Sequence, residues 1–183
     1  MELELKRGGR TARVETLGGE LVSYRDERGL EYIWGGDPAY WPGRNPLLFP
    51  IVGMLKEGKI RFDGREYAME RHGFARRREF TPAARGEDWV RLELRESAET
   101  LALYPYSFRL AVEQRLTDTG FSTAVTVANP GEGPLPFCLG AHTGFRCPLE
   151  AGERFEDYEL VFPERESCPT LLLRDGLLDR PAA

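Results

Sequence analysis

Hydrophobic and polar residues alternate in short runs along the N-terminal part of the chain. Such runs cover residues 3–7, 13–16 and 21–25, and a glycine or a charged turn closes each one. Alternation with a period of two is typical of a strand that buries one face, and turn residues at each end separate neighbouring strands. We therefore expect a meander of short strands at the start of the chain.

The same pattern continues further along. Residues 90–95 alternate apolar and charged side chains, part of 108–116 does so too, and 122–128 is rich in β-branched residues. Only residues 38–41 and 97–103 suggest helix, each for one or two turns. The pattern predicts an all-β fold, an antiparallel β-sandwich, in which the Pro-Gly-rich run at 130–134 is a loop.

A hairpin is predicted around Asp63-Gly64. The flanking segments, Lys59–Phe62 and Arg65–Ala68, have strand character, and Asp-Gly favours a type I′ turn because both central residues need positive φ.

Composition limits the classes of function. A chain of 183 residues can form one core, so we expect a single domain over residues 1–183. The net charge of -5 argues against binding to nucleic acid or to an anionic membrane surface. The sequence lacks a leader-like N-terminus and a long apolar run, which predicts a cytoplasmic protein without a membrane partner.

The cysteines give no sign of a metal site or a disulfide framework. Cys138, Cys147 and Cys168 form no Cys-x-x-Cys pattern, and their odd number favours reduced thiols. The apolar neighbours of Cys138 and Cys147 predict buried, inert sulfur atoms. The two histidines lie in unrelated segments and give no support to a zinc site, so no metal and no cofactor are expected.

The two histidines are the strongest candidates for chemistry. His72 lies in the segment RHGFAR (71–76) and His142 in GAHTGF (140–145). Imidazole exchanges protons near neutral pH, because its unperturbed pKa is about 6.5. If both loops reach one cleft, the two rings form an acid/base or hydrogen-bonding pair for a small polar substrate. The alternative is that each is an ordinary surface or core histidine.

Arg44 and Asn45 are candidate substrate-binding residues. They lie between Pro42 and Pro46, which stiffen the backbone ahead of an apolar run. Arg and Asn donors beside aromatic faces commonly hold sugar hydroxyls, and four aromatic residues are near in sequence. These are Trp34, Tyr40, Trp41 and Phe49. The alternative is that Arg44 caps strand-end carbonyls and the aromatic residues belong to the core.

The order of these motifs resembles a known family. The segments RNPLLFPIVG (44–53), the Asp63-Gly64 hairpin, RHGFAR (71–76) and LPFCLGAHTGFRCP (135–148) are similar to those of the aldose 1-epimerases, or galactose mutarotases, in their LacX-like bacterial branch. The resemblance implies a galactose mutarotase-like β-sandwich and a small aldose as substrate. It also implies that Arg44 and His72 hold the sugar, and that His142 is the general acid.

Aldose epimerisation opens the sugar ring, which requires a proton at the ring oxygen and a base at the anomeric hydroxyl. The resemblance implies that this base is a glutamate from a late strand, beyond the region that aligns with residues 181–183. We therefore expect the chain to be an N-terminal portion, truncated at its C-terminus, with impaired turnover. The acidic residues at 150–159 are interpreted as the solvated face of a strand rather than as substitutes for the base.

Three alternatives stay open at this stage. The chain could be a non-catalytic carbohydrate-binding module with the same fold. Arg71 and the arginines at 76–78 surround His72 and could bind the phosphate of a hexose phosphate, which would make the protein a hexose-phosphate mutarotase. Missing late strands would also leave open sheet edges through which the chain could self-associate.

Overall fold

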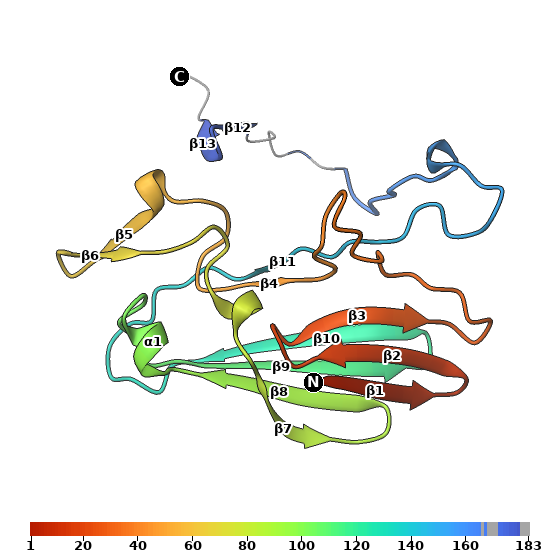
Figure 1. Cartoon of the computed structure of the whole chain (residues 1–183), viewed down its shortest axis with the longest axis horizontal. Helices are drawn as coiled ribbons and strands as arrows, with labels where there is room; N and C mark the ends of the chain where they lie inside the picture. The colour runs from red at the N-terminus through yellow and green to blue at the C-terminus, as the bar shows by residue number, and fades with distance from the viewer. Residues whose placement is uncertain (166, 168–171, 180–183) are drawn as a thin grey trace.

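Two antiparallel sheets form the body of the molecule (Figure 1). A computed structural model describes residues 1–165, 167 and 172–179. The first sheet has the order β1-β2-β3 and the second has the order β10-β9-β8-β7. Their strands are β1 (Glu2–Arg7), β2 (Arg10–Glu15), β3 (Glu20–Arg25), β7 (Thr81–Arg85), β8 (Trp89–Arg95), β9 (Arg109–Thr117) and β10 (Gly120–Ala128). This arrangement confirms the predicted all-β fold.

The core lies between the two sheets and follows directly from the alternating pattern. On β1 and β2, Leu5 and Val14 are completely buried, and on β8 and β9 the same holds for Leu92 and Leu110. Each of these residues is flanked on at least one side by a more exposed position on its strand, as expected when only one face of a sheet is covered. Burial of such side chains stabilises the fold by about 1.5–3 kcal/mol each.

The predicted hairpin is present with the expected bounds. Strands β5 (Lys59–Phe62) and β6 (Arg65–Ala68) pair in register, and Asp63 and Gly64 have φ values of 46° and 80°. The helix expected over 97–103 is also present as α1 (Ala98–Leu101), where Ser97 caps the first turn by accepting a hydrogen bond from the backbone amide of Thr100.

Two local expectations were wrong. Residues 38–41 form a turn, not a helix, in which the carbonyl of Asp37 accepts the amides of Tyr40 and Trp41. Residues 150–162 were expected to include a strand, but they contain the 3-10 helix η3 (Phe155–Asp157) and no strand. No other described segment pairs with them, and their apolar side chains are exposed, with Phe155 at 71% and Leu160 at 86%. An alternating run does not become a strand without a partner.

The sequence did not predict strand β7. β7 contains Pro82, has no buried position, and its pairing with β8 shifts register between Pro82 and Ala84. Such features are typical of an edge strand, which the hydrophobic pattern does not reveal.

Short elements complete the described chain: β4 (Leu47–Leu48), β11 (Gly140–Ala141), β12 (Leu172–Arg174), β13 (Leu177–Asp179), and the 3-10 helices η1 (Lys56–Gly58) and η2 (Ala75–Arg77). In Figure 1 the pair β4–β11 crosses above β3 and β10, and this pair positions the candidate site. None of the helices in the described ranges has the length and apolar character needed to span a membrane.

Candidate active site

Arg44 and His142 belong to one antiparallel ribbon. Leu47 pairs with Ala141 and Leu48 with Gly140. Beyond these pairs the amide of His142 donates to the carbonyl of Pro46 at 3.1 Å, and the amide of Gly144 donates to that of Arg44 at 2.7 Å. Residues 44–48 and 140–144 therefore run side by side, although nearly a hundred residues separate them in sequence.

Alternation along this ribbon separates its side chains into two sets. Residues 45, 47, 141 and 143 face the sheets, where they line a cavity of about 60 Å³ together with Gln114 and Thr123. Asn45 is buried there, and its Oδ1 accepts a hydrogen bond of 2.6 Å from the hydroxyl of Thr143. Arg44 and His142 occupy the alternate positions and so share the opposite face.

His72 is held by Gly53 through two hydrogen bonds. The amide of His72 donates to the carbonyl of Gly53 at 2.8 Å, and the amide of Gly53 donates to Nδ1 of His72 at 3.0 Å. Both His72 and Gly73 have positive φ, at 67° and 69°. Gly73 makes a parallel bridge with Phe49, so the histidine loop is attached directly to the end of β4.

The environment of His72 keeps its ring neutral. Partial burial lowers the pKa of His72, and the nearby Arg76, His142 and Arg71 lower it further. Because Nδ1 accepts the Gly53 amide, the neutral ring carries its proton on Nε2 and can donate a hydrogen bond from that atom.

The two imidazoles face one another. Their ring centroids lie 6.2 Å apart and their planes are nearly perpendicular, at 88°. The exposed ring of His142 also packs against Trp41, at 5.2 Å between centroids. Gly144 permits this packing, because a Cβ at that position would lie 2.8 Å from Trp41. The guanidinium of Arg44 lies against Gly36, where a Cβ would be 3.0 Å from Cζ.

The candidate aromatic residues have separate positions. Phe49 is fully buried in the core, as one alternative anticipated, and Tyr40 is 83% exposed. Trp34 donates from its indole nitrogen to the carbonyl of Trp41 at 2.8 Å, which fixes the loop that carries Trp41. Trp41 is thus the candidate that contacts a histidine.

The expectation of buried cysteines was wrong, because Cys138 and Cys147 are exposed. Cys138 follows Phe137, which is itself 44% exposed. Apolar neighbours in sequence do not bury a thiol where no other layer covers the segment. Cys168 lies outside the described residues.

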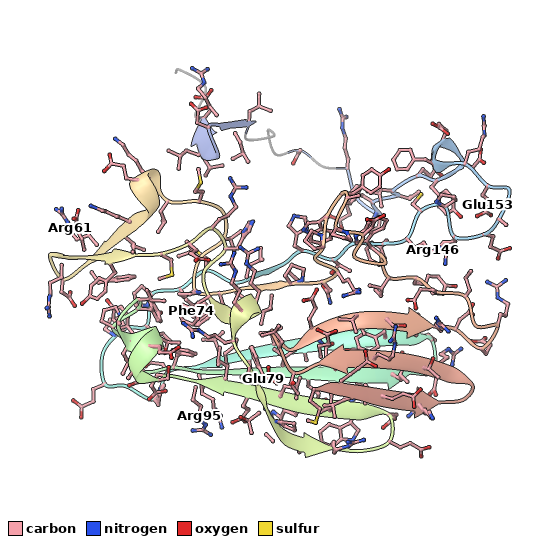
Figure 2. All side chains as sticks on the ribbon, viewed as in Figure 1. Arg61, Phe74, Glu79, Arg95, Arg146 and Glu153 are labelled. Atoms are coloured by element: carbon pink, nitrogen blue, oxygen red, sulfur yellow. The ribbon has the colours of Figure 1, made fainter. Side chains whose placement is uncertain are left out.

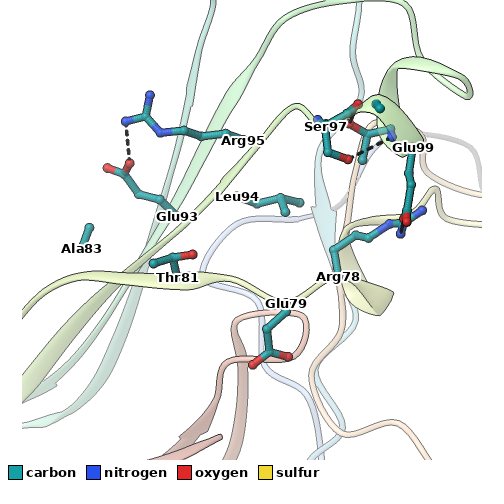
Figure 3. Close-up of a pocket in the computed structure, with 11 residues that line it drawn as sticks. Arg78, Glu79, Thr81, Ala83, Glu93, Leu94, Arg95, Ser97 and Glu99 are labelled. Carbon is teal, nitrogen blue, oxygen red and sulfur yellow. Dashed lines mark hydrogen bonds and ion pairs between the residues drawn. The ribbon is translucent and has the colours of Figure 1, made fainter.

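Other polar surfaces do not join the histidine pair. A hollow of about 800 Å³ lies between β7 and α1 (Figure 3). Its charged groups are paired as Arg78–Glu99 and Arg95–Glu93, and Glu79 pairs with the N-terminal ammonium of Met1. Glu153 lies on an outlying loop, well away from Phe74 beside the histidine loop (Figure 2). Among the described residues, no group of three His, Cys, Asp or Glu side chains is arranged to hold a metal ion.

The two imidazoles and Trp41 together offer hydrogen-bond donors beside an apolar face. His72 presents a neutral N–H, His142 presents an accessible imidazole, and Trp41 provides an apolar face beside it. In the described part of the chain, no carboxylate forms a hydrogen bond or an ion pair with either imidazole. Such a donor set suits a neutral or anionic polyhydroxylated ligand.

A model of the family described as Aldose 1-epimerase matches residues 1–175. This chain belongs to the aldose 1-epimerase family. It is 41% identical to the plasmid-encoded and chromosomal LacX proteins of Lactococcus lactis subsp. lactis over 187 residues, which cover 98% of this chain. The same alignments cover 62% of each LacX protein, so the chain spans about three fifths of the length of these curated relatives.

Solved structures of aldose 1-epimerase relatives share the fold. A galactose mutarotase related enzyme from Lactobacillus acidophilus matches with a TM-score of 0.83 and 28% identity, over 86% of this chain and 53% of its own. A galactose mutarotase-like protein from Lactobacillus casei matches with a TM-score of 0.78 and 33% identity, over 82% and 52% of the two chains. The family resemblance inferred from the motifs is thereby confirmed.

Sequence reasoning missed the residues that fix this geometry through the backbone. The backbone of Gly53 forms hydrogen bonds with both the amide and the ring Nδ1 of His72. The hydroxyl of Thr143 donates to the side chain of Asn45 across the ribbon. Glu20, at the start of β3, accepts the backbone amides of Arg44 and Asn45. Gly53 lies within the family motif, whereas nothing in the local sequence around Glu20 signals its long-range contact.

Proposed function

We propose that the site binds an aldose and opens its ring by acid/base chemistry, which interconverts the α and β anomers. The observation that carries this proposal is the facing pair of imidazoles, 6.2 Å apart, formed by the two histidines of the sequence. In this proposal His142 donates a proton to the ring oxygen. Arg44 and His72 hold sugar oxygens as hydrogen-bond donors, and neither a metal nor an organic cofactor takes part.

The different settings of the two histidines support different roles. The lowered pKa of His72 keeps it a neutral donor, suited to binding in the ground state. His142 is exposed, and its backbone amide is fixed to Pro46, so its ring can reach a bound ligand. Asn45 was expected to contact the sugar. Its buried side chain bonds Thr143 on the face of the ribbon opposite His142, so this proposal assigns sugar binding to Arg44 and His72 and gives Asn45 no sugar contact.

Ring opening also needs a base at the anomeric hydroxyl. We propose that a carboxylate supplies it from the part of the family fold that the LacX proteins have in addition to the portion matched here. The absence of a carboxylate bonded to either imidazole, within the described residues, favours this assignment. Loss of a general base lowers a rate by a factor of roughly 100 to 10,000, so the 183-residue chain should turn over slowly.

Polarimetry on freshly dissolved α-D-galactose and α-D-glucose tests this proposal. We expect the 183-residue chain to accelerate mutarotation little above buffer, while retaining sugar binding by calorimetry. Binding without turnover is also the result expected of a carbohydrate-binding module, and a version of the chain extended with the remaining family strands separates the two. Rapid turnover by the chain alone would refute the proposed origin of the base.

Binding by variants tests the assigned residues. Arg44→Ala and His72→Ala should weaken galactose binding more than His142→Ala, because an acid that acts in the transition state contributes little to ground-state binding. Arg61→Ala is the matched control, since Arg61 lies on the exposed hairpin β5–β6 and pairs with Glu66. Unchanged affinity in both Arg44→Ala and His72→Ala would remove the assignment.

A hexose phosphate is the second candidate substrate, and one observation favours it. Arg71 and Arg76 both lower the pKa of His72, and Nε of Arg76 is buried without a hydrogen-bond partner among the described residues. An anion would satisfy such a cationic site. Galactose 6-phosphate should then bind more tightly than galactose, and Arg71→Gln should abolish the difference. Equal affinities would exclude this candidate.

We also propose that the chain self-associates through its sheet edges. In the described part of the chain β10 pairs only with β9, so one edge of this nine-residue strand is open. Size-exclusion chromatography with light scattering should show species larger than 20.8 kDa whose proportion rises with concentration. A monomer at all concentrations would contradict this proposal.

A further inference from the structure

Glu20 lies on β3, which carries neither histidine, yet it contacts the ribbon that carries His142. It is the first residue of β3 and follows Gly18 and Gly19, which both have positive φ. One oxygen of its carboxylate, Oε1, accepts the amide of Arg44 at 2.9 Å and the amide of Asn45 at 2.6 Å. Hydrogen bonds to an ionised carboxylate are roughly twice as strong as neutral ones.

Arg44 is consequently held on both sides of its backbone. Glu20 accepts its amide, and its carbonyl accepts the amide of Gly144 at 2.7 Å. Asn45, whose amide also reaches Glu20, bonds Thr143 through its side chain at 2.6 Å. Thr143 and Gly144 directly follow His142, so both routes from Glu20 end beside the candidate acid.

We propose that Glu20 is a positioning residue, which holds the Arg44–Asn45 turn and thereby sets the placement of Arg44 and His142 for sugar binding. This inference rests on the proposed function. Glu20 does not touch the ligand; it acts through the backbone amides of Arg44 and Asn45, which have no strand partner among the described residues. In Figure 1 the ribbon β4–β11 lies above β3, the strand that begins with Glu20.

Amide hydrogen exchange tests the positioning without any ligand. In Glu20→Ala the amides of Arg44 and Asn45 should exchange at least about tenfold faster, as expected for the loss of charge-assisted hydrogen bonds. Glu20→Gln keeps an oxygen acceptor and should retain most of the protection. Glu15→Ala is the matched control, because Glu15 is the register partner of Glu20 on β2. Unchanged exchange in Glu20→Ala would overturn the inference.

A binding cycle separates positioning from a purely structural role. Glu20→Ala should weaken galactose binding about tenfold or more while the protein stays folded by circular dichroism, and Glu20→Gln should restore most of the affinity. In an Arg44→Ala background, Glu20→Ala should add little, since the two residues act as a unit. Additive losses, or a loss of stability with unchanged affinity per folded molecule, would overturn the inference. If the unaltered chain binds no sugar, the proposed function fails, and the exchange experiment still decides the role of Glu20.

Discussion

Gly73→Ala is the substitution whose effect on the site can be calculated most directly. The residue next to it, His72, is one of the paired imidazoles, and Gly73 has φ of 69°. A Cβ at position 73 would lie 2.5 Å from the carbonyl carbon of Phe49 and 2.7 Å from the nitrogen of Pro50. Both are backbone atoms at the end of β4, so no side chain can rotate away to relieve the clash.

The cost has three parts. Left-handed backbone costs an alanine about 1–2 kcal/mol. Forcing an extra methyl group into a packed site costs about 1–3 kcal/mol. Displacement of Phe49 also weakens the hydrogen bonds that its carbonyl accepts from Phe74 at 3.0 Å and Ala75 at 3.2 Å, each worth about 0.5–1.5 kcal/mol. The first two parts together lower the free energy of unfolding by about 2–5 kcal/mol, and weakening of the two hydrogen bonds adds to this loss.

Urea denaturation followed by tryptophan fluorescence measures this loss. Gly29→Ala is the matched control, because Gly29 has φ of 81° and nothing lies within 4 Å of its would-be Cβ. The control should lose only the backbone part, about 1–2 kcal/mol. If Gly73→Ala is no more destabilising than Gly29→Ala, the close attachment of the histidine loop to β4 is refuted.

Three further predictions concern single residues. Folding lowers the pKa of His72, so as pH falls the unfolded chain takes up the imidazole proton before the folded chain does, and the free energy of unfolding should decrease below about pH 6.5 until the folded pKa is passed. His72→Asn should flatten this part of a plot of unfolding free energy against pH, and an unaltered slope would contradict the prediction. Cys138 and Cys147 should react quickly with a thiol reagent in the native protein, each serine variant removing one fast-reacting group, and slow reaction would show that they are covered. Ser97→Ala should destabilise the chain by about 1 kcal/mol in urea, through loss of the cap on α1, and no change would show that the cap is immaterial.

Local chemistry made parts of the fold predictable. The Asp63-Gly64 turn needs positive φ at both residues, and the hairpin formed with the expected bounds. The strand at 90–95 alternates strictly and lies in the sheet as β8. Residues 150–162 alternate less regularly and form no strand, because pairing depends on a partner that sequence pattern does not supply. The prediction that Cys138 and Cys147 are buried failed for the same reason, because burial depends on which other segments cover them.

The candidate site was predictable in its chemistry and unpredictable in its geometry. The glycines and aromatic residues around His72 and His142 identified them as candidates, and the structure brings their rings together. The sequence predicted that Arg44 and Asn45 both contact the ligand. In the structure these adjacent residues of the ribbon point to opposite faces, and the side chain of Asn45 bonds Thr143. The carboxylate of Glu20 accepts the backbone amides of Arg44 and Asn45, which lie 24 and 25 positions further along the chain. Every residue except proline has such an amide, so the side chains give no sign of this contact.

The central claim is that the two imidazoles form one sugar site. Histidine-labelled NMR tests it most directly, because the chain has two histidines and each gives its own ring resonances. During titration with galactose, the ring resonances of both histidines should shift along one binding curve. Arg44→Ala should lower the affinity obtained from that curve, while Arg61→Ala leaves it unchanged. Shifts of one ring alone, or binding by calorimetry with neither ring responding, would contradict the account.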